Sequence, residues 1–260
     1  MRKILVTAAN RRFFPGAEAL LKGARKHHPD VPRFCYVPPG DRDEAVGRIG
    51  QLAEILVAPR PVAGIPDAMQ CYVPKLFAPT LDADVMAYVD SDAILCRPIP
   101  ELWDVPEGRV NVVRDGAPSV IQSVPPNLRP AFSACYPNQL DIPCFNGGVW
   151  ALRSAEFRDL VERYEAELAK VRFPEYHPIL DQPMLNVMWQ HRLNWLPFRC
   201  NVNNLFDHRI PRDARIVHFT GGQCKPWDPH YPKHEPQYYW WLKHGLQERD
   251  PARLALARLR

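Results

Sequence analysis

The sequence predicts an α/β domain whose central sheet is mixed but mostly parallel and is flanked by helices. Strand-like apolar runs at residues 4–9, 34–37, 55–57 and 85–89 alternate with helical stretches in the first third of the chain. Such alternation is typical of parallel βαβ units, in which each crossover helix packs on the sheet. The chain has 260 residues, of which 46% are hydrophobic, and this is enough for one domain with a sizeable core.

Helices are expected between these strands at residues 15–28, where Pro15 opens the helix, at 43–52 and at 74–80. Proline is pre-organised for the first helical turn because its φ is already fixed.

The second half of the chain mixes both kinds of element. Strand-like apolar runs are present at residues 110–113, 148–152 and 215–219. Ser154 is placed to cap a helix whose apolar residues follow at helical spacing. A further helix is expected at residues 181–190.

Charge, hydropathy and cysteine usage narrow the class of protein. The net charge is +4, and basic residues do not interleave with aromatic ones, so no nucleic-acid partner is expected. No run approaches the roughly 18–20 apolar residues that span a bilayer, and the short run after Met1 reads as a strand rather than a signal peptide. The seven cysteines show no C-x-x-C spacing and indicate reduced thiols rather than a zinc site or a disulfide framework. The predicted location is therefore cytoplasmic.

Proline is frequent, with 29 residues, and many of them lie between Pro118 and Pro143. Because proline lacks a backbone donor and fixes φ, this stretch is expected to be irregular. Long loops in compact domains often form lids or binding loops, so residues 115–143 are expected to shape an acceptor pocket.

The strongest local signal is Asp90-Ser91-Asp92, which directly follows the apolar run 85–89. Ligands bind at the carboxyl ends of the strands in open α/β sheets. Two neighbouring carboxylates repel each other unless a cation or protons intervene, and a hard divalent cation could also hold a diphosphate. The alternative is a solvated turn that caps a helix.

A second signal begins at His218, which lies near the end of the run 215–219 and is followed by Gly221, Gly222 and Lys225. Glycines let the backbone approach a phosphate closely, and lysine supplies a compact positive charge for its oxygens. A neutral imidazole can complete the coordination of a metal. Taken alone, a histidine at a strand end is more often structural.

Two further segments could face a sugar. Asn146 and Gly147 lie at a strand entry, where amide groups can reach hydroxyls; the alternative is a turn that needs positive φ. Asp181 and Gln182 begin the helix 181–190, where Asp181 could face an anomeric carbon or could serve as an N-cap.

The chain resembles the glycogenin-like retaining glycosyltransferases of family 8. The resemblance is carried by four segments, which follow one another in the family's order: VDSDAIL, CFNGGVWAL, LDQPMLN and VHFTGGQCKPW. VPKL at residues 73–76 is a weaker match. The resemblance runs from about Ile4 to Trp227. It implies the GT-A fold, a Rossmann-like nucleotide-diphospho-sugar transferase fold. Residues 1–235 would form a single catalytic domain, with a nucleotide-binding half at 1–115 and an acceptor and sugar half at 116–235, and residues 236–260 would form a helical tail.

The resemblance also implies the roles of particular residues. The positions that match the family's functional residues are Asp90, Asp92 and His218 for the metal; Ala8, Asn10, Lys75, Asp90, Ser91, Asn146, Gly147, Gly221 and Lys225 for the nucleotide-sugar; and Asp181 and Gln182 for catalysis.

By the same resemblance, the donor is a UDP-sugar, with glucose or galactose as the hexose, and the acceptor is a glycan, a lipid-linked molecule or another hydroxyl. The cofactor is Mn²⁺, with Mg²⁺ as the alternative, and imidazole as third ligand favours the softer ion. Transfer retains the anomeric configuration, by front-face attack or by double displacement.

Two rival functions remain at this stage. A haloacid-dehalogenase-like phosphatase also places Asp-x-Asp after an apolar strand, but it leaves residues 218–227 unexplained. A nucleotide-sugar-binding protein without catalysis is the other. The C-terminal tail carries Trp240, Trp241 and Lys243, followed by several arginines, and could contact the inner face of a membrane peripherally. The alternative, which is the more common arrangement, is a helix packed on the domain with a solvated charged face. A homodimer is one arrangement that the sequence allows.

Overall fold

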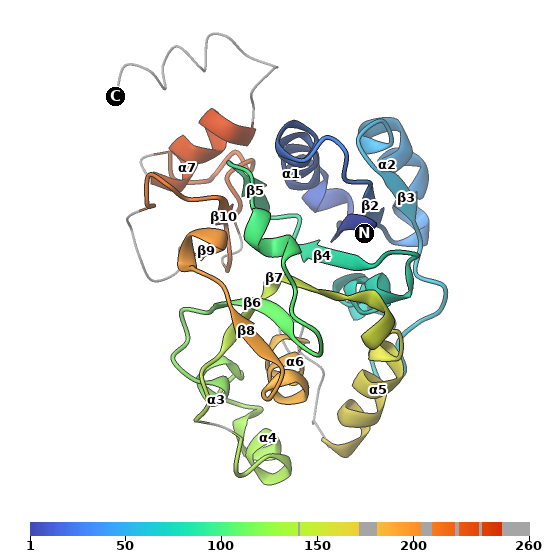
Figure 1. Cartoon of the computed structure of the whole chain (residues 1–260), viewed down its shortest axis with the longest axis vertical. Helices are drawn as coiled ribbons and strands as arrows, with labels where there is room; N and C mark the ends of the chain where they lie inside the picture. Colours follow the sequence, from blue (N-terminus) through green and yellow to red (C-terminus); the bar gives the residue numbers. More distant parts are fainter. Residues whose placement is uncertain (140, 172–180, 204–209, 222–223, 234–235, 246–260) are drawn as a thin grey trace.

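The computed structural model describes residues 1–260 except 140, 172–180, 204–209, 222–223, 234–235 and 246–260. In the part of the chain so described, a large central sheet has helices on both faces, and a small second sheet lies beside it (Figure 1). None of the described helices combines the length and the apolar character that a membrane span requires.

The large sheet contains seven of the described strands. In spatial order they are β3 (Glu54–Leu56), β2 (Arg33–Tyr36), β1 (Lys3–Ala8), β4 (Val85–Val89), β7 (Phe145–Arg153), β6 (Val110–Arg114) and β8 (Leu193–Trp195). All neighbouring pairs are parallel except those made by β7, which runs antiparallel to both β4 and β6. The sheet is therefore mixed and mostly parallel, as the sequence predicts.

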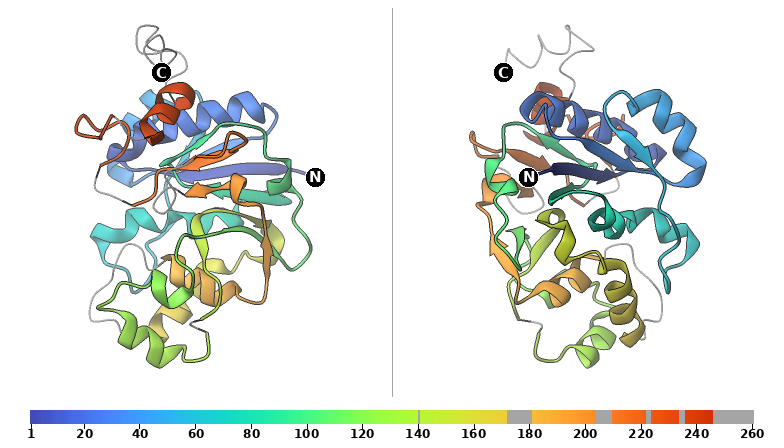
Figure 2. Two further views of the ribbon diagram at one scale, coloured as in Figure 1. Left: turned by 90° about the vertical axis from the view of Figure 1, so that its left-hand side faces the viewer. Right: turned by 45° about the vertical axis from the view of Figure 1, so that its right-hand side comes forward.

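Continuous apolar runs form the central strands because both of their faces are covered. Every residue of β4 is buried. Along β1, Ile4 and Val6 pack on the side of helices α5 (Leu160–Lys170) and α6 (Asp181–Trp189), and Leu5 packs on the side of helix α1 (Phe14–His27). Figure 2 shows these two helical layers on either side of the sheet. Parallel strands that are buried in this way do not need alternating polarity.

The α-helices agree with the predicted stretches where periodicity was clear. Together they are α1 (Phe14–His27), α2 (Arg42–Ile49), α3 (Val120–Ser123), α4 (Arg129–Cys135), α5 (Leu160–Lys170), α6 (Asp181–Trp189) and α7 (Pro236–Trp240). Pro15 lies in the first turn of α1, as expected. A π-helical turn, η9 (Trp241–Gly245), continues α7, and the rest of the predicted helical tail lies outside the described residues.

Short 3-10 helices connect many of these elements. They are η1 (Arg11–Phe13), η2 (Pro39–Asp41), η3 (Asp67–Tyr72), η4 (Pro74–Thr80), η5 (Pro100–Trp103), η6 (Ser154–Glu156) and η8 (Phe198–Cys200).

Three local predictions differ from the structure. The helix expected at residues 74–80 is the 3-10 helix η4, because Pro79 inside it lacks the amide that an α-helix needs. Ser154 begins the 3-10 turn η6 and does not cap an α-helix; Phe157 then leaves helical geometry with φ −134° and enters the core, so α5 begins only at Leu160. The proline-rich stretch is not irregular throughout, since it contains α3 and α4.

The small sheet brings distant parts of the chain together. Its strands are β5 (Ala93–Leu95), β10 (Ile216–His218) and β9 (Val202–Asn203). His218 pairs with Ala93 on one side and with Asn203 on the other. The backbone amide of Phe219 donates to the carbonyl of Asp92 at 2.8 Å. This pairing sets the last strand directly against the loop that follows β4.

Candidate active site

The loop Asp90-Ser91-Asp92 lies at the edge of the large sheet where β4 ends and β7 begins. Asp90 follows the last residue of β4, and its backbone amide donates to the carbonyl of Gly148 in β7 at 2.7 Å. Because β7 is antiparallel to β4, the start of β7 lies at the same edge as the end of β4. This is the edge at which open α/β sheets bind ligands.

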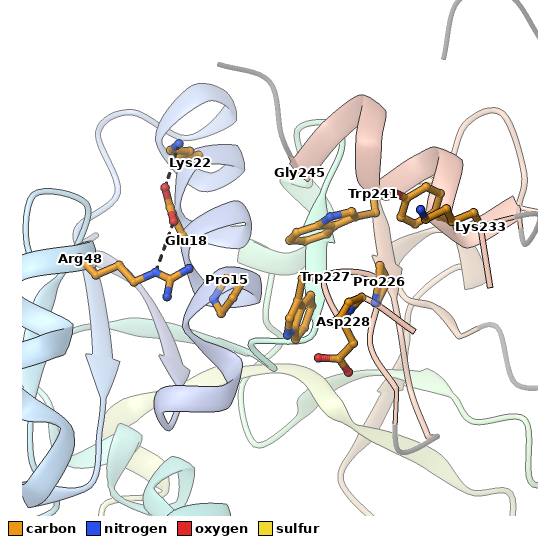
Figure 3. Close-up of a pocket in the computed structure, with 12 residues that line it drawn as sticks. Pro15, Glu18, Lys22, Arg48, Pro226, Trp227, Asp228, Lys233, Trp241 and Gly245 are labelled. Carbon is orange, nitrogen blue, oxygen red and sulfur yellow. Dashed lines mark ion pairs between the residues drawn. The ribbon is translucent and has the colours of Figure 1, made fainter. Parts of the chain in front are cut away.

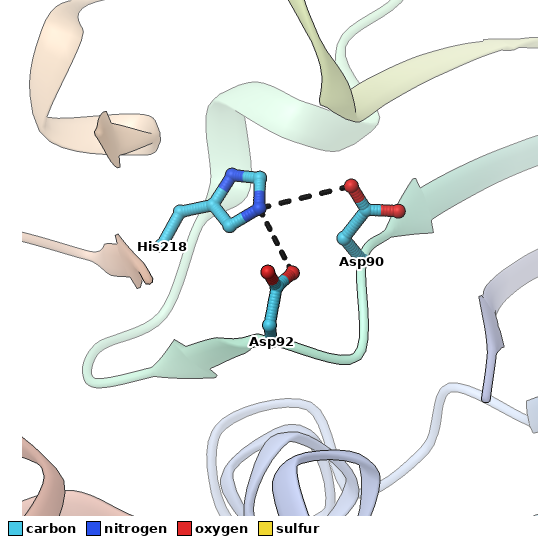
Figure 4. Close-up of side chains that lie close together, drawn as sticks. All are labelled: Asp90, Asp92 and His218. Carbon is cyan, nitrogen blue, oxygen red and sulfur yellow. Dashed lines mark hydrogen bonds and ion pairs between the residues drawn. The ribbon is translucent and has the colours of Figure 1, made fainter. Parts of the chain in front are cut away.

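Two carboxylates and one imidazole converge at this edge (Figure 4). The Nε2 atom of His218 lies 3.0 Å from Oδ1 of Asp92 and 3.7 Å from Oδ2 of Asp90. One ligand atom from each of the three residues lies within 4.8 Å of the other two. Carboxylate oxygens and a neutral imidazole are ligands for a divalent metal such as Mn²⁺ or Zn²⁺, so this donor set fits the cation that the sequence predicts.

The backbone of Gly148 makes the close approach of these groups sterically feasible. A Cβ atom at this position would collide with Cε1 of His218 and with Oδ2 of Asp90. Only glycine therefore allows the imidazole and the carboxylate to lie against the start of β7.

Asp92 is paired with two basic groups. Its second oxygen, Oδ2, accepts a hydrogen bond from Nζ of Lys225 at 2.7 Å, while Oδ1 faces His218. Burial alone would raise the pKa of the Asp92 carboxyl, but His218 and Lys225 together hold this pKa well below its ordinary value. Asp92 is therefore ionised at neutral pH.

A second buried ion pair lies on the other side of Asp90. The ammonium of Lys75 in η4 contacts the Asp181 carboxylate at the start of α6 and lies 3.8 Å from Oδ1 of Asp90. Tyr88 donates to that same Asp90 oxygen at 2.7 Å. Burial raises the pKa of the Asp181 carboxyl, and the Lys75 ammonium opposes this shift.

Gln182, Asn146 and Asp115 form one hydrogen-bonded network beside these pairs. The Oε1 atom of Gln182 accepts from the Gly147 amide at 3.0 Å, and its Nε2 donates to Oδ2 of Asp115 at 3.1 Å. Asn146 donates to Oδ1 of Asp115 at 3.1 Å, and Asn203 donates to the same atom at 2.8 Å. Donors and acceptors of this kind can bind the hydroxyls of a sugar.

All these groups line one cavity of about 630 Å³. Every site residue predicted from the sequence is part of its lining: Ala8, Asn10, Lys75, Asp90, Ser91, Asp92, Asn146, Gly147, Asp181, Gln182, His218, Gly221 and Lys225. The lining also includes residues that the sequence did not single out, among them Asp115, Tyr88 and Asn203. The size is ample for a nucleotide-sugar, since ligand pockets are typically about 300–1,000 Å³.

A family model of glycosyl transferase family 8 matches residues 69–230. This chain belongs to glycosyltransferase family 8. Enzymes of this family are typically dependent on a divalent metal, and the Asp90, Asp92 and His218 cluster agrees with that property. Membership also excludes the phosphatase alternative.

Solved glycosyltransferase structures share the fold of this family 8 chain. The galactosyltransferase LgtC, in complex with donor and acceptor sugar analogs, is 16% identical with a TM-score of 0.68; the match covers 97% of this chain and 99% of LgtC. The bifunctional glycosyltransferase WbbM is 15% identical with a TM-score of 0.64, and the match covers 99% of this chain but only 51% of WbbM. The chain therefore spans about half the length of WbbM.

GlyE of Streptococcus pneumoniae TIGR4 is 15% identical with a TM-score of 0.64, over 99% of this chain and 63% of GlyE. These likenesses establish the GT-A architecture of this glycosyltransferase. No curated protein matches the chain.

A second cavity of about 480 Å³ in this glycosyltransferase lies between α1 and the residues at 226–233 and 238–245 (Figure 3). On one side, Glu18 forms ion pairs with Lys22 and Arg48. On the other side lie Trp227 and Trp241, whose ring centroids are 5.1 Å apart.

The sequence left two arrangements open for the C-terminal tail: contact with a membrane surface, or a helix packed on the domain. Trp241 is buried, with 3% of its surface exposed, and it packs against Phe219 and Trp227. Trp241 therefore agrees with the packed arrangement, since it belongs to the apolar cluster that also contains Ala19 of α1 and Val217 of the small sheet. The arginines at positions 249, 253, 258 and 260 lie outside the described residues.

Proposed function

We propose that the chain transfers a hexose, glucose or galactose, from a UDP-sugar to a hydroxyl of a glycan, a lipid-linked molecule or another acceptor, with retention of anomeric configuration. The observation that carries this proposal is the convergence of Asp90, Asp92 and His218 beside Lys225 in a cavity that also holds Asp181 and Gln182. Residues 1–115 would bind the nucleotide, and residues 116–235 would bind the sugar and the acceptor.

Asp90, Asp92 and His218 would hold Mn²⁺, or Mg²⁺ as the alternative. When bound, such a cation supplies positive charge next to the diphosphate as the sugar–phosphate bond breaks. Lys225 adds a further positive charge from the chain itself, on the same side of the cavity. Stabilisation of a leaving group by charges that are fixed in advance is usually among the largest contributions to catalysis.

The opposite side of the cavity would bind the donor sugar. Asp181 carries a carboxylate that can stabilise positive charge at the anomeric carbon, and Lys75 keeps this carboxylate in place. Gln182 and Asn146 would orient the sugar hydroxyls. Ala8, the last residue of β1, and Asn10, just beyond it, would contact the uridine, with Ser91 and Gly221 nearer the diphosphate.

The experiment is a donor panel with the purified protein. UDP-glucose, UDP-galactose and related donors are incubated with Mn²⁺, with Mg²⁺ or with a chelator, and UDP release is measured. We expect UDP release from one hexose donor that requires the metal. Binding of UDP-sugars without release of UDP under any condition would favour the non-catalytic alternative.

The Asp92→Asn variant tests the metal site in the same assay. It should abolish the metal-dependent reaction, because one of the three ligands loses its charge. Asp82→Asn is the matched control, since Asp82 is exposed and pairs only with Arg2 among the described ion pairs. Full activity of Asp92→Asn would refute the assigned role of Asp92.

A further inference from the structure

Asn201 is a fully buried residue that contacts the His218 ring at Nδ1, the nitrogen that does not face Asp90 and Asp92. It precedes strand β9 and has no exposed surface. Its Oδ1 atom lies 3.2 Å from Nδ1 of His218, and its Nδ2 atom donates to Oδ1 of Asn146 at 3.0 Å. The side chain therefore joins the imidazole to the network on the sugar side of the cavity.

The orientation of this amide follows from a backbone group whose role is fixed. The backbone amide of Gly148 can only donate, and it lies 3.1 Å from the Asn146 side chain, so the atom that faces it is an oxygen. The other end of Asn146 faces the carboxylate of Asp115, which accepts hydrogen bonds, and this places the Asn146 nitrogen there. Both neighbours of Asn146 thus require the same orientation.

The same reasoning continues to Asn201 and His218. Because the Asn146 oxygen faces Asn201, the Asn201 atom next to it must be the donating nitrogen, and the oxygen of Asn201 then faces His218. An amide oxygen only accepts hydrogen bonds, so Nδ1 of His218 must carry a proton. Nε2 is the nitrogen directed at the carboxylates of Asp90 and Asp92, where a cation would take the place of a proton shared with those oxygens, so Nε2 would be the coordinating atom.

We propose that Asn201 is a positioning residue that keeps the proton on Nδ1 of His218 and thereby presents Nε2 to the divalent cation. The inference rests on the proposed function in that it takes Asp90, Asp92 and His218 to be the metal ligands. Partners that bind the second nitrogen of a metal-binding histidine fix its tautomer and its ring orientation. Asn201 also links the metal side of the cavity to Asn146.

The test compares three variants by Mn²⁺ binding in the presence of UDP. Asn201→Leu keeps the approximate shape of the side chain but cannot accept a hydrogen bond. Asn201→Asp keeps an acceptor next to Nδ1. Asn111→Leu is the matched control, because Asn111 is another fully buried amide, and it donates to the backbone carbonyls of Glu101 and Asp104.

Two quantities are measured. The first is the dissociation constant of Mn²⁺, from electron paramagnetic resonance. The second is the coupling of the bound Mn²⁺ to an imidazole ¹⁴N nucleus, from electron spin echo modulation, which reports directly on ligation by histidine. We expect Asn201→Leu to raise the dissociation constant about 10–100-fold and to weaken the ¹⁴N coupling. Asn201→Asp should retain the coupling, and Asn111→Leu should retain both properties even if it is less stable.

The outcomes separate this inference from the function on which it rests. A wild-type protein that binds no Mn²⁺, or binds it without ¹⁴N coupling, would refute the assigned metal site itself. Normal wild-type binding together with an unchanged Asn201→Leu variant would overturn the role of Asn201 alone. If Asn201→Leu does not fold, the Asn201→Asp variant decides, because loss of the ¹⁴N coupling despite the remaining acceptor would also overturn it.

Discussion

The ammonium of Lys225 lies 2.7 Å from Oδ2 of Asp92, although 133 positions separate the two residues. The same ammonium donates to the backbone carbonyls of Phe219 at 2.6 Å and Gly221 at 2.9 Å. These three acceptors match the three donors of a lysine side chain. Lys225 is therefore fixed in place before any donor molecule binds.

Replacing Lys225 with Met should lower kcat/KM about 100–1,000-fold, because the proposed diphosphate site loses a fixed positive charge while the length of the side chain is kept. UDP release at saturating and limiting donor concentrations measures this effect. Lys170→Met is the control, since Lys170 is exposed on α5 and pairs with Glu167. A decrease of less than about threefold for Lys225→Met would contradict the role of this lysine.

Gly148→Ala should disrupt the proposed metal site without removing a ligand. The added Cβ would collide with His218 and Asp90, and the forced displacement should cost about 1–3 kcal/mol of unfolding free energy. Titration with Mn²⁺ should show a weaker site. Gly47→Ala is the control, because nothing lies within 4 Å of a Cβ at that helical position. Equal Mn²⁺ affinity in Gly148→Ala and the wild type would show that the site tolerates this displacement.

Gln182→Ala should separate catalysis from metal binding. Gln182 bonds to Gly147 and Asp115 and does not belong to the Asp90, Asp92 and His218 cluster. We expect kcat to fall about 10–1,000-fold, because the variant lacks the group proposed to orient the sugar, while Mn²⁺ affinity stays unchanged. The exposed Gln51→Ala variant should match the wild type in both measurements. Loss of Mn²⁺ binding in Gln182→Ala would instead indicate a general structural role.

His244 should make stability depend on pH below neutrality. Burial lowers the pKa of this imidazole to about 4 in the folded protein. The unfolded chain, in which histidine titrates near 6.5, therefore binds a proton that the folded chain excludes. The stability that His244 contributes is fully present above about pH 6.5 and is lost as the pH falls toward 4.

The measurement is urea unfolding of the metal-free protein at pH 7.5 and pH 5. Because the imidazole is only partly shielded from solvent, we expect the wild type to lose about 1 kcal/mol more than His244→Phe between these pH values. Phenylalanine preserves the stacking on Trp240, which contacts His244 at a ring distance of 5.0 Å. The exposed His191→Phe variant should follow the wild type. Identical pH profiles of His244→Phe and the wild type would show that His244 does not cause the loss.

The parts of the fold that could be predicted from the sequence are those that local patterns determine. The strands β1 and β4 are continuous apolar runs because helices cover both of their faces, and this leaves a clear signal in the chain. The strands β5, β8 and β9 have only two or three residues, which is too short for any periodicity. Their formation depends on partners that are distant in the sequence.

The same distinction applies to the candidate site. Asp90, His218 and Lys225 lie in contiguous motifs next to glycines or other acidic residues, so the sequence could indicate them. Asp115 directly follows β6 in the way that Asp90 follows β4, and this position was the available signal for it. Asn201 carries no such signal, because its role exists only through hydrogen bonds to residues 17 and 55 positions away.

The antiparallel pairing of β4 with β7 has a consequence for sequence length. Val89 lies opposite Val149, and the amide of Asp90 bonds to Gly148, so this register determines which residue meets the imidazole. Since side chains alternate between the two faces of a strand, deleting or inserting one residue within β7 would bring Gly147 or the bulkier Val149 to the place of Gly148. Natural variation in length among homologous chains should therefore avoid β7 and accumulate in the loops.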